Sequence, residues 1–153
     1  MNLVKESISF QRGNDPKNVL GIGQRHLIEA WMEEMDITNY FINDDMTIDA
    51  DRIFLKDHGL TQLPDYIQFN IINGYFNISY NELTTLRGCP IELKPNPSRS
   101  FELNFRCNNN KLTSLEYCPK KIGGEFHCGN NYKSFSKRYV TKYCKVNPYK
   151  IFL

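Results

Sequence analysis

The chain has 153 residues, of which 41% are hydrophobic and 24% charged, which is enough apolar material for one compact domain with its own core. Its formal net charge of +2 excludes the strong overall field that would by itself indicate a nucleic acid as the partner. No apolar run reaches the roughly 18 residues of a membrane span, and the amino terminus lacks the features of a secretory signal, so we expect a cytosolic protein.

Residues 1–52 are predicted to form an amino-terminal cap made of a helix and a hairpin. Asp15 and Pro16 suit the start of a short helical turn, which two glycines at positions 21 and 23 separate from the next segment. Residues 24–35 predict a helix, because they place a set of apolar side chains on one face: Leu27, Ile28, Trp31, Met32 and Met35. Residues 40–49 predict a β-hairpin that leads into the centre of the chain.

The centre of the chain, residues 53–135, repeats one short pattern. A Leu-x-x-Leu element occurs at residues 60–63, 83–86 and 112–115, and residues 132–135 are a degraded fourth copy. Each copy follows a short alternating stretch whose first residues lie 23, 29 and 21 positions apart. The longest interval contains a segment rich in Pro and Ser, residues 93–100, which predicts a surface loop. An asparagine stands at one fixed place after three of the stretches, at Asn81, Asn110 and Asn131, and His58 fills that place after the first.

A period of 20 to 29 residues with paired leucines predicts a short leucine-rich-repeat-like β-solenoid of about four coils, and the helical ends make the fold class α+β. One coil cannot bury its own apolar side chains, so stacked coils should form inward columns of phenylalanine, leucine and cysteine. The asparagines are expected to bond the backbone of neighbouring turns and to adopt left-handed geometry where the chain leaves each strand.

Residues 136–153 predict a carboxyl-terminal cap. Ser136 is a suitable N-cap for a helix that ends at Cys144, with Tyr139, Val140 and Tyr143 packing inward. Residues 149–153 then predict a terminal strand. Both ends of the repeat are therefore expected to be closed within one chain, as a solenoid requires.

Three stretches of the sequence carry a resemblance to a known family. They are "ISFQRGNDPKNVLGIG" near the start, "FINDDMTIDADRIFLKDHGLTQLPDYIQFNIINGYFNISYNELTTLRGCP" in the middle, and "LEYCPKKIGGEFHCGNN" followed by a helix and "YKIFL" at the end. Together they cover most of the chain, which resembles the small leucine-rich-repeat-like proteins of large tailed bacteriophages, a mostly uncharacterised family. The chain departs from that pattern in the inserted "LKPNPSRS" and in "YKSF". The resemblance implies a solenoid fold and a viral origin, in the host cytoplasm or the virion, and it implies no mechanism.

The strand alternation predicts which side chains face outward from the stack, and this face is the expected binding site for a protein partner. An aromatic, an Arg and a His in adjacent rungs would form a small hot spot. The predicted binding residues are Phe54, Lys56, Tyr75, Asn77, Ser79, Asn104, Arg106, Asn108, Glu125 and His127.

Enzymatic and metal-binding functions are weakly supported. The last four cysteines lie 11, 10 and 16 residues apart, which matches coils and differs from the close pairs of structural zinc sites. No pattern marks a thiol activated by a base. Residues 43–49 lack the ligand spacing of a calcium loop, and residues 21–23 lack the third glycine of a dinucleotide loop. We therefore expect no catalysis, metal or cofactor.

The remaining alternative is a nucleic-acid-associated phage protein that uses the basic carboxyl-terminal half. Lysine and arginine are frequent from residue 87 onward, but Glu92, Glu102, Glu116 and Glu125 are interspersed among them, and Glu82 lies just before. The sequence thus favours a non-catalytic phage module that binds another protein, either in the virion or in the infected host cell.

Overall fold

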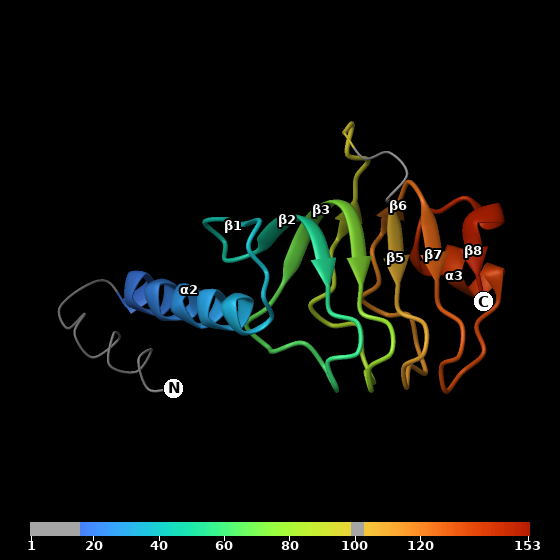
Figure 1. Ribbon diagram of the computed structural model, residues 1–153, viewed down its shortest axis with the longest axis horizontal. Helices are drawn as coiled ribbons and strands as arrows, with labels where there is room; N and C mark the ends of the chain where they lie inside the picture. Colours follow the sequence, from blue (N-terminus) through green and yellow to red (C-terminus); the bar gives the residue numbers. More distant parts are fainter. Residues whose placement is uncertain (1–15, 99–102) are drawn as a thin grey trace.

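The computed structural model describes residues 16–98 and 103–153, and it shows a β-solenoid of about four coils with a helix at each end (Figure 1). This α+β architecture confirms the predicted fold class. The main ladder of strands runs β1-β2-β3-β5-β7-β8, and all of its neighbours except the first pair are parallel. The strands stand side by side along the long axis of the molecule (Figure 1).

The amino-terminal cap consists of helix α2 (Pro16–Glu34) and the hairpin of β1 (Tyr40–Ile42) and β2 (Ile48–Phe54). The helix continues through Gly21 and Gly23, so the predicted break between two helical segments is wrong; an interior glycine costs only about 1 kcal/mol. The expected N-cap, Asp15, lies outside the described residues. The helix ends in a Schellman motif, in which left-handed Asp36 allows the Ile37 N–H to donate to Met32 O.

The hairpin prediction is confirmed, and hydrogen bonds within its acidic turn occupy the Asp45 carboxylate. The Asp45 carboxylate accepts the Thr47 N–H at 3.0 Å and the Thr47 hydroxyl at 2.6 Å. These hydrogen bonds hold the pKa of Asp45 below its usual value. The turn is therefore a polar hairpin turn held by its own hydrogen bonds.

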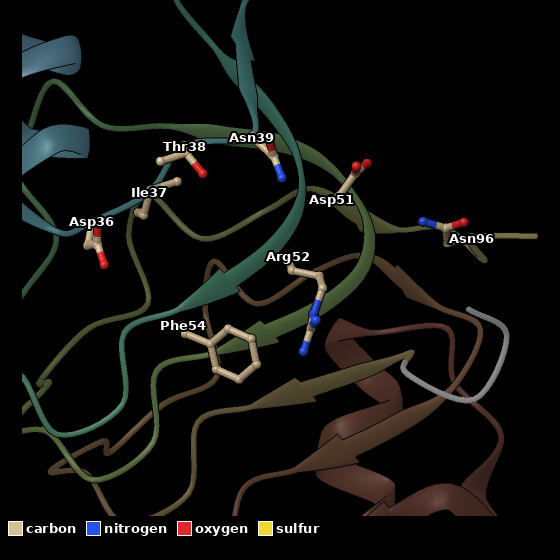
Figure 2. A pocket seen from close by; sticks show the side chains of 8 residues that line it. All are labelled: Asp36, Ile37, Thr38, Asn39, Asp51, Arg52, Phe54 and Asn96. Carbon is tan, nitrogen blue, oxygen red and sulfur yellow. The ribbon is translucent and has the colours of Figure 1, made fainter. Parts of the chain in front are cut away.

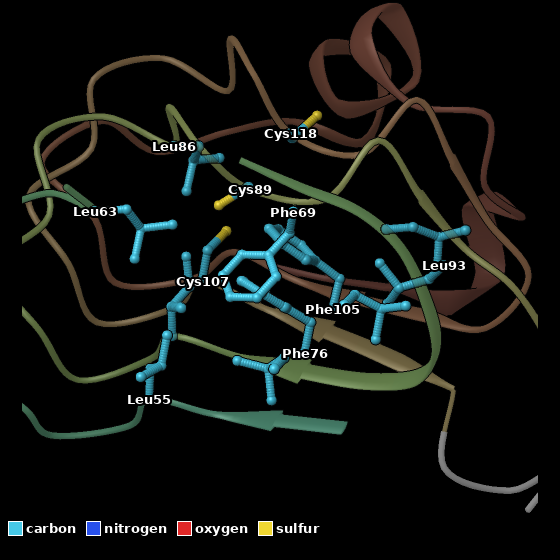
Figure 3. Close-up of a cluster of buried hydrophobic side chains, with 14 of the residues drawn as sticks. Leu55, Leu63, Phe69, Phe76, Leu86, Cys89, Leu93, Phe105, Cys107 and Cys118 are labelled. Atoms are coloured by element: carbon cyan, nitrogen blue, oxygen red, sulfur yellow. The ribbon is translucent and has the colours of Figure 1, made fainter. Parts of the chain in front are cut away.

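The coils that follow carry β3 (Phe69–Asn77), β5 (Asn104–Arg106) and β7 (Glu125–His127) in the main ladder. Their central residues are in register, with Ile53 beside Phe76, Phe105 and Phe126 in turn. The three phenylalanine rings are fully buried and lie 5.8 and 5.2 Å apart, centroid to centroid. Figure 3 shows Phe76 and Phe105 in the buried cluster together with Cys89 and Cys107. The predicted inward column of phenylalanine is confirmed.

A second, shorter ladder was not expected. The long strand β3 bends at Gly74, which has a φ of 141°, so that its first half pairs with β4 (Glu92–Leu93) and its second half with β5. Strand β6 (Lys121–Ile122) extends this ladder beyond β4, and a bridge from Lys121 to Lys145 ends it. Of the predicted surface loop 93–100, Lys94, Pro95, Pro97 and Ser98 are exposed as expected, whereas Leu93 is buried in β4 and residues 99 and 100 lie outside the described residues.

Buried asparagine side chains join successive coils. Asn110 Nδ2 donates to Ile78 O at 3.0 Å and to Cys107 O at 3.1 Å, and its Oδ1 accepts the Leu83 N–H at 3.0 Å. Asn81 and Asn131 make the same set of bonds one coil earlier and one coil later. The predicted backbone bonding is thus confirmed. The left-handed residue, however, is the one before each asparagine, namely Tyr80, Asn109 and Asn130, and Asp57 holds the same place before His58 in the first coil.

The carboxyl-terminal cap comprises helix α3 (Lys137–Tyr143), the 3₁₀ turn η1 (Pro148–Lys150) and strand β8 (Ile151–Phe152). Ser136 caps α3 as predicted, since its Oγ accepts the Tyr139 N–H at 3.1 Å. Val140 is buried, but Tyr143 is 37% exposed and lies against Tyr139 with the two rings tilted by 48°, so its predicted inward packing is wrong. The terminal strand is shorter than predicted because η1 occupies its first part.

Candidate functional site

The outward side chains of β2, β3, β5, β7 and β8 form one surface, which we call the strand face. Strand register places five of them in a single line across the ladder: Phe54 beside Asn77, Asn77 beside Arg106, Arg106 beside His127, and His127 beside Phe152. We call this line the central row. The predicted binding residues on these strands therefore do lie together on one face.

Two of the predicted binding residues are not available to a partner. Asn77 and Ser79 are only 5% and 2% exposed, although alternation predicted them to face solvent. The Asn77 Oδ1 accepts both the N–H and the hydroxyl of Ser79, and its Nδ2 donates to the Tyr75 hydroxyl at 2.9 Å. Both side chains are buried, and their hydrogen bonds connect Tyr75, Asn77 and Ser79 within the strand face.

The first end of the strand face is an aromatic and cationic cluster. The ring of Phe54 lies 4.8 Å from the ring of Tyr75, and the Arg52 guanidinium carbon lies 4.9 Å from the Phe54 centroid. Phe54 is still 48% exposed. Because Asn77 fixes the Tyr75 hydroxyl, this cluster is ordered before any partner arrives, which lowers the entropy that binding must cost.

The other end of the strand face is built on His127. Its Nε2 lies 2.8 Å from Glu125 Oε2, and its ring stacks on Phe152 with a centroid distance of 4.5 Å and an interplanar angle of 10°. Asn104, in the amide orientation that suits its neighbours, donates to the same Glu125 oxygen at 3.2 Å. The carboxylate of Glu125 is thus already engaged by two groups of the face.

Arg106 stands between these two ends, in the middle of the central row. In the described part of the chain its Nε is buried and has no hydrogen-bond partner, and its guanidinium forms no ion pair. Within the same described residues, the neighbouring Asn108 Oδ1 also lacks a partner, while its Nδ2 donates to Asn109. Lys56, at the margin, places its ammonium 4.8 Å from the ring of Tyr80. Arg106 is therefore a half-buried cation of this face that has no counter-ion among the described residues.

Sequence reasoning missed Arg52, Tyr80 and Phe152 as members of this surface. Alternation did not assign Arg52 to this face, because register shifts between Ile48 and Arg52 interrupt the regular alternation of β2. Phe152 was expected in a terminal strand, but its place beside His127 depends on how β8 pairs with β7. Tyr80 is left-handed, and its exposure follows from that geometry.

A depression of about 290 Å³ adjoins the first end of the strand face (Figure 2). Asp36, Asn39, Asp51, Arg52, Phe54 and Asn96 are among its lining residues. Figure 2 shows the side chains of Arg52 and Phe54 next to each other on β2. The lining is polar and carries charges of both signs, so the depression extends the strand face but indicates no particular class of ligand. No group of three His, Cys, Asp or Glu side chains that would hold a metal occurs in residues 16–98 and 103–153.

The five cysteines are buried free thiols and line the interior of the coils. Cys107 and Cys128 continue the column that begins with Leu55 and Ile78 on adjacent strand ends. Burial raises the pKa of every one of these thiols, to about 12 for Cys128 and Cys144. A buried thiol that stays protonated is a poor nucleophile and a poor metal ligand.

We expect these thiols to resist a chromogenic disulfide reagent at pH 8 in the folded protein and to react within about a minute after unfolding in guanidinium chloride.

The raised pKa of the buried thiols also makes the stability of the fold depend on pH. Above about pH 8.5 the unfolded thiols lose protons that the folded state retains, so the free energy of unfolding should fall as the pH rises from there toward 12. One thiol that reacts rapidly in the native protein would contradict this assignment and indicate an accessible, activated cysteine.

A second surface lies away from the strand face, beside α3. A shallow depression there is lined by Lys120, Lys142, Lys145 and Tyr143, with no carboxylate among its lining residues. The three lysines are exposed and, in the part of the chain that the structure describes, form no ion pair. This arrangement can attract an anion, and we call it the lysine patch.

No described helix has both the length and the apolar composition of a membrane span. Comparisons of the chain with protein-family models, curated protein sequences and solved structures found no match.

Proposed function

We propose that this chain is a non-catalytic protein-binding module of a bacteriophage and that it binds a protein partner through the strand face, in the virion or in the infected host cell. The phage origin rests on the sequence resemblance described above. The binding role rests on one observation: the central row presents Arg106 without a counter-ion between two ordered aromatic ends. A rigid surface of this kind can bind without first being ordered.

Capture from infected cells tests this proposal. The immobilised wild-type chain should retain a protein that the variants Arg106→Ala and His127→Ala lose, because each removes a group from the middle of the face. Lys142→Ala is the matched control, since it removes an exposed cation from the lysine patch and should leave capture unchanged. A partner retained equally by all four proteins would show that the strand face is the wrong surface.

The lysine patch favours a second candidate function, association with nucleic acid. Three exposed lysines next to an exposed tyrosine suit a phosphate backbone with an unpaired base. Binding to single-stranded DNA should then weaken steeply with salt, and replacing all three lysines by alanine should reduce the slope of log K against log [salt] by about 2. An unchanged slope in the triple variant would remove the lysine patch from consideration.

A further inference from the structure

One charged group of the strand face, the Arg106 guanidinium, has no counter-ion among the described residues. The Glu125 carboxylate, on the strand next to that of Arg106, accepts from His127 and from Asn104. Arg106 lies next to Asn77, whose amide oxygen accepts two hydrogen bonds from Ser79 and whose amide nitrogen donates to Tyr75. A partner that fits must therefore bring an acceptor to Arg106, and a carboxylate is the acceptor that matches the planar guanidinium with two parallel hydrogen bonds.

The aromatic groups of the central row flank Arg106 symmetrically. Phe54 lies two strands away on one side and Phe152 two strands away on the other. They are 48% and 45% exposed, so each offers an apolar ring to a ligand. Since neighbouring strands are about 4.8 Å apart, each aromatic position lies about 9.6 Å from Arg106 along the row.

This spacing selects the conformation of the partner. A polyproline-II helix has three residues per turn and a rise of about 3.1 Å, so every third side chain returns to the same face after about 9.3 Å. An α-helix comes nearest with residues seven apart, at about 10.5 Å, and over two intervals it overshoots the row by about 2 Å. Over the same two intervals, the side chains of a polyproline-II segment differ from the positions of the row by less than about 1 Å.

The partner is also expected to cross the strands rather than extend the sheet. All five side chains of the row belong to the face of the ladder, and the strands β3, β5 and β7 that carry its centre are paired on both edges. Their backbone groups are therefore used, and specificity must come from side chains.

We propose that the strand face binds an acidic polyproline-II segment with the pattern apolar-x-x-Asp/Glu-x-x-apolar, laid along the central row. Its carboxylate pairs with Arg106, and its two apolar side chains pack on Phe54 and on Phe152. This inference rests on the proposed function, because it specifies the chemistry of the partner of that same face.

The test uses a labelled peptide with the sequence Leu-Pro-Pro-Glu-Pro-Pro-Leu and the full chain, with fluorescence anisotropy to measure binding and nuclear magnetic resonance to locate it. We expect shifts at residues of the central row. Replacing the peptide Glu by Gln, or making Arg106→Gln in the protein, should weaken binding about tenfold, and Arg106→Lys should recover part of it. Phe152→Ala should also weaken binding, while Lys137→Ala, which removes an exposed cation of α3, should have no effect.

Three results would overturn this inference. They are equal binding of the Glu and Gln peptides, tighter binding of a helical peptide that carries the same three side chains seven residues apart, and no binding of the polyproline peptide to the wild-type chain. Circular dichroism of each variant separates lost binding from lost folding. The capture experiment judges the proposed function independently: a partner lost with Arg106→Ala would keep the face as the binding site even if its ligand were helical.

Discussion

Asn110→Asp should lower the free energy of unfolding by about 3–5 kcal/mol at pH 7, although the two side chains have nearly the same shape. The introduced carboxylate can still accept the Leu83 N–H. It cannot donate to the carbonyl oxygens of Ile78 and Cys107, which lie 3.0 and 3.1 Å from the present amide nitrogen. A charge would then face two carbonyl oxygens at a position that is only 6% exposed. Chemical denaturation at fixed ionic strength measures the loss.

The matched control is Asn130→Asp, which makes the same change of charge at an exposed left-handed turn residue of the next coil. We expect this control to stay within about 0.5 kcal/mol of wild type. The deficit of Asn110→Asp should also shrink as the pH falls toward 4. Burial raises the pKa of the introduced group in the folded state above its unfolded value, so the destabilisation appears only as the pH rises through that window. Equal stability of the two variants at pH 7 would show that the asparagine bonds do not join the coils.

Phe105→Ala should cost about 3–5 kcal/mol, because it removes a fully buried ring from the middle of the phenylalanine column. The ring is stacked on Phe76 and meets Phe126 edge-on, so its loss leaves a void between two coils rather than at an end. Phe105→Leu, which keeps most of the volume, should cost less than half as much. Phe41→Ala is the surface control, since Phe41 is 66% exposed.

Phe105→Ala also tests how cooperatively the coils of the stack unfold. In a solenoid each coil contacts only its neighbours, so a void in one coil weakens the coupling between the two halves. Trp31, the only tryptophan, lies in the amino-terminal cap 6.5 Å from Phe69 and reports on that half. We expect wild-type unfolding curves from tryptophan fluorescence and circular dichroism to coincide and those of Phe105→Ala to separate. Coincident curves in the variant would mean that cooperativity does not pass through this column.

The repeat could be predicted because its causes are local and recur along the chain. The fixed place of Asn81, Asn110 and Asn131 after each strand, and the return of phenylalanine at the same offset, follow from the bonds and columns that every coil needs. The hairpin of β1 and β2 and the cap at Ser136 were also visible, because turn and cap preferences act over a few residues.

The composition of the candidate site depended on contacts that no local pattern records. Alternation predicted that Asn77 and Ser79 face solvent, but both are buried and hydrogen-bond to each other, and Asn77 also donates to the Tyr75 hydroxyl. The second ladder escaped prediction because β4 and β6 have two residues each, too few to show a period.

The sequence by itself determined that this chain is a stack of coils with closed ends, since burying one repeat against the next is the only way to cover its apolar side chains. The tertiary structure decided which groups stand exposed on that stack. Phe152 reaches His127 because β8 returns beside β7, and the Glu125 carboxylate is engaged by His127 and Asn104 while the described residues offer Arg106 no counter-ion. These arrangements join residues that are distant in sequence, and their energies arise from pairing and packing after the coils have formed.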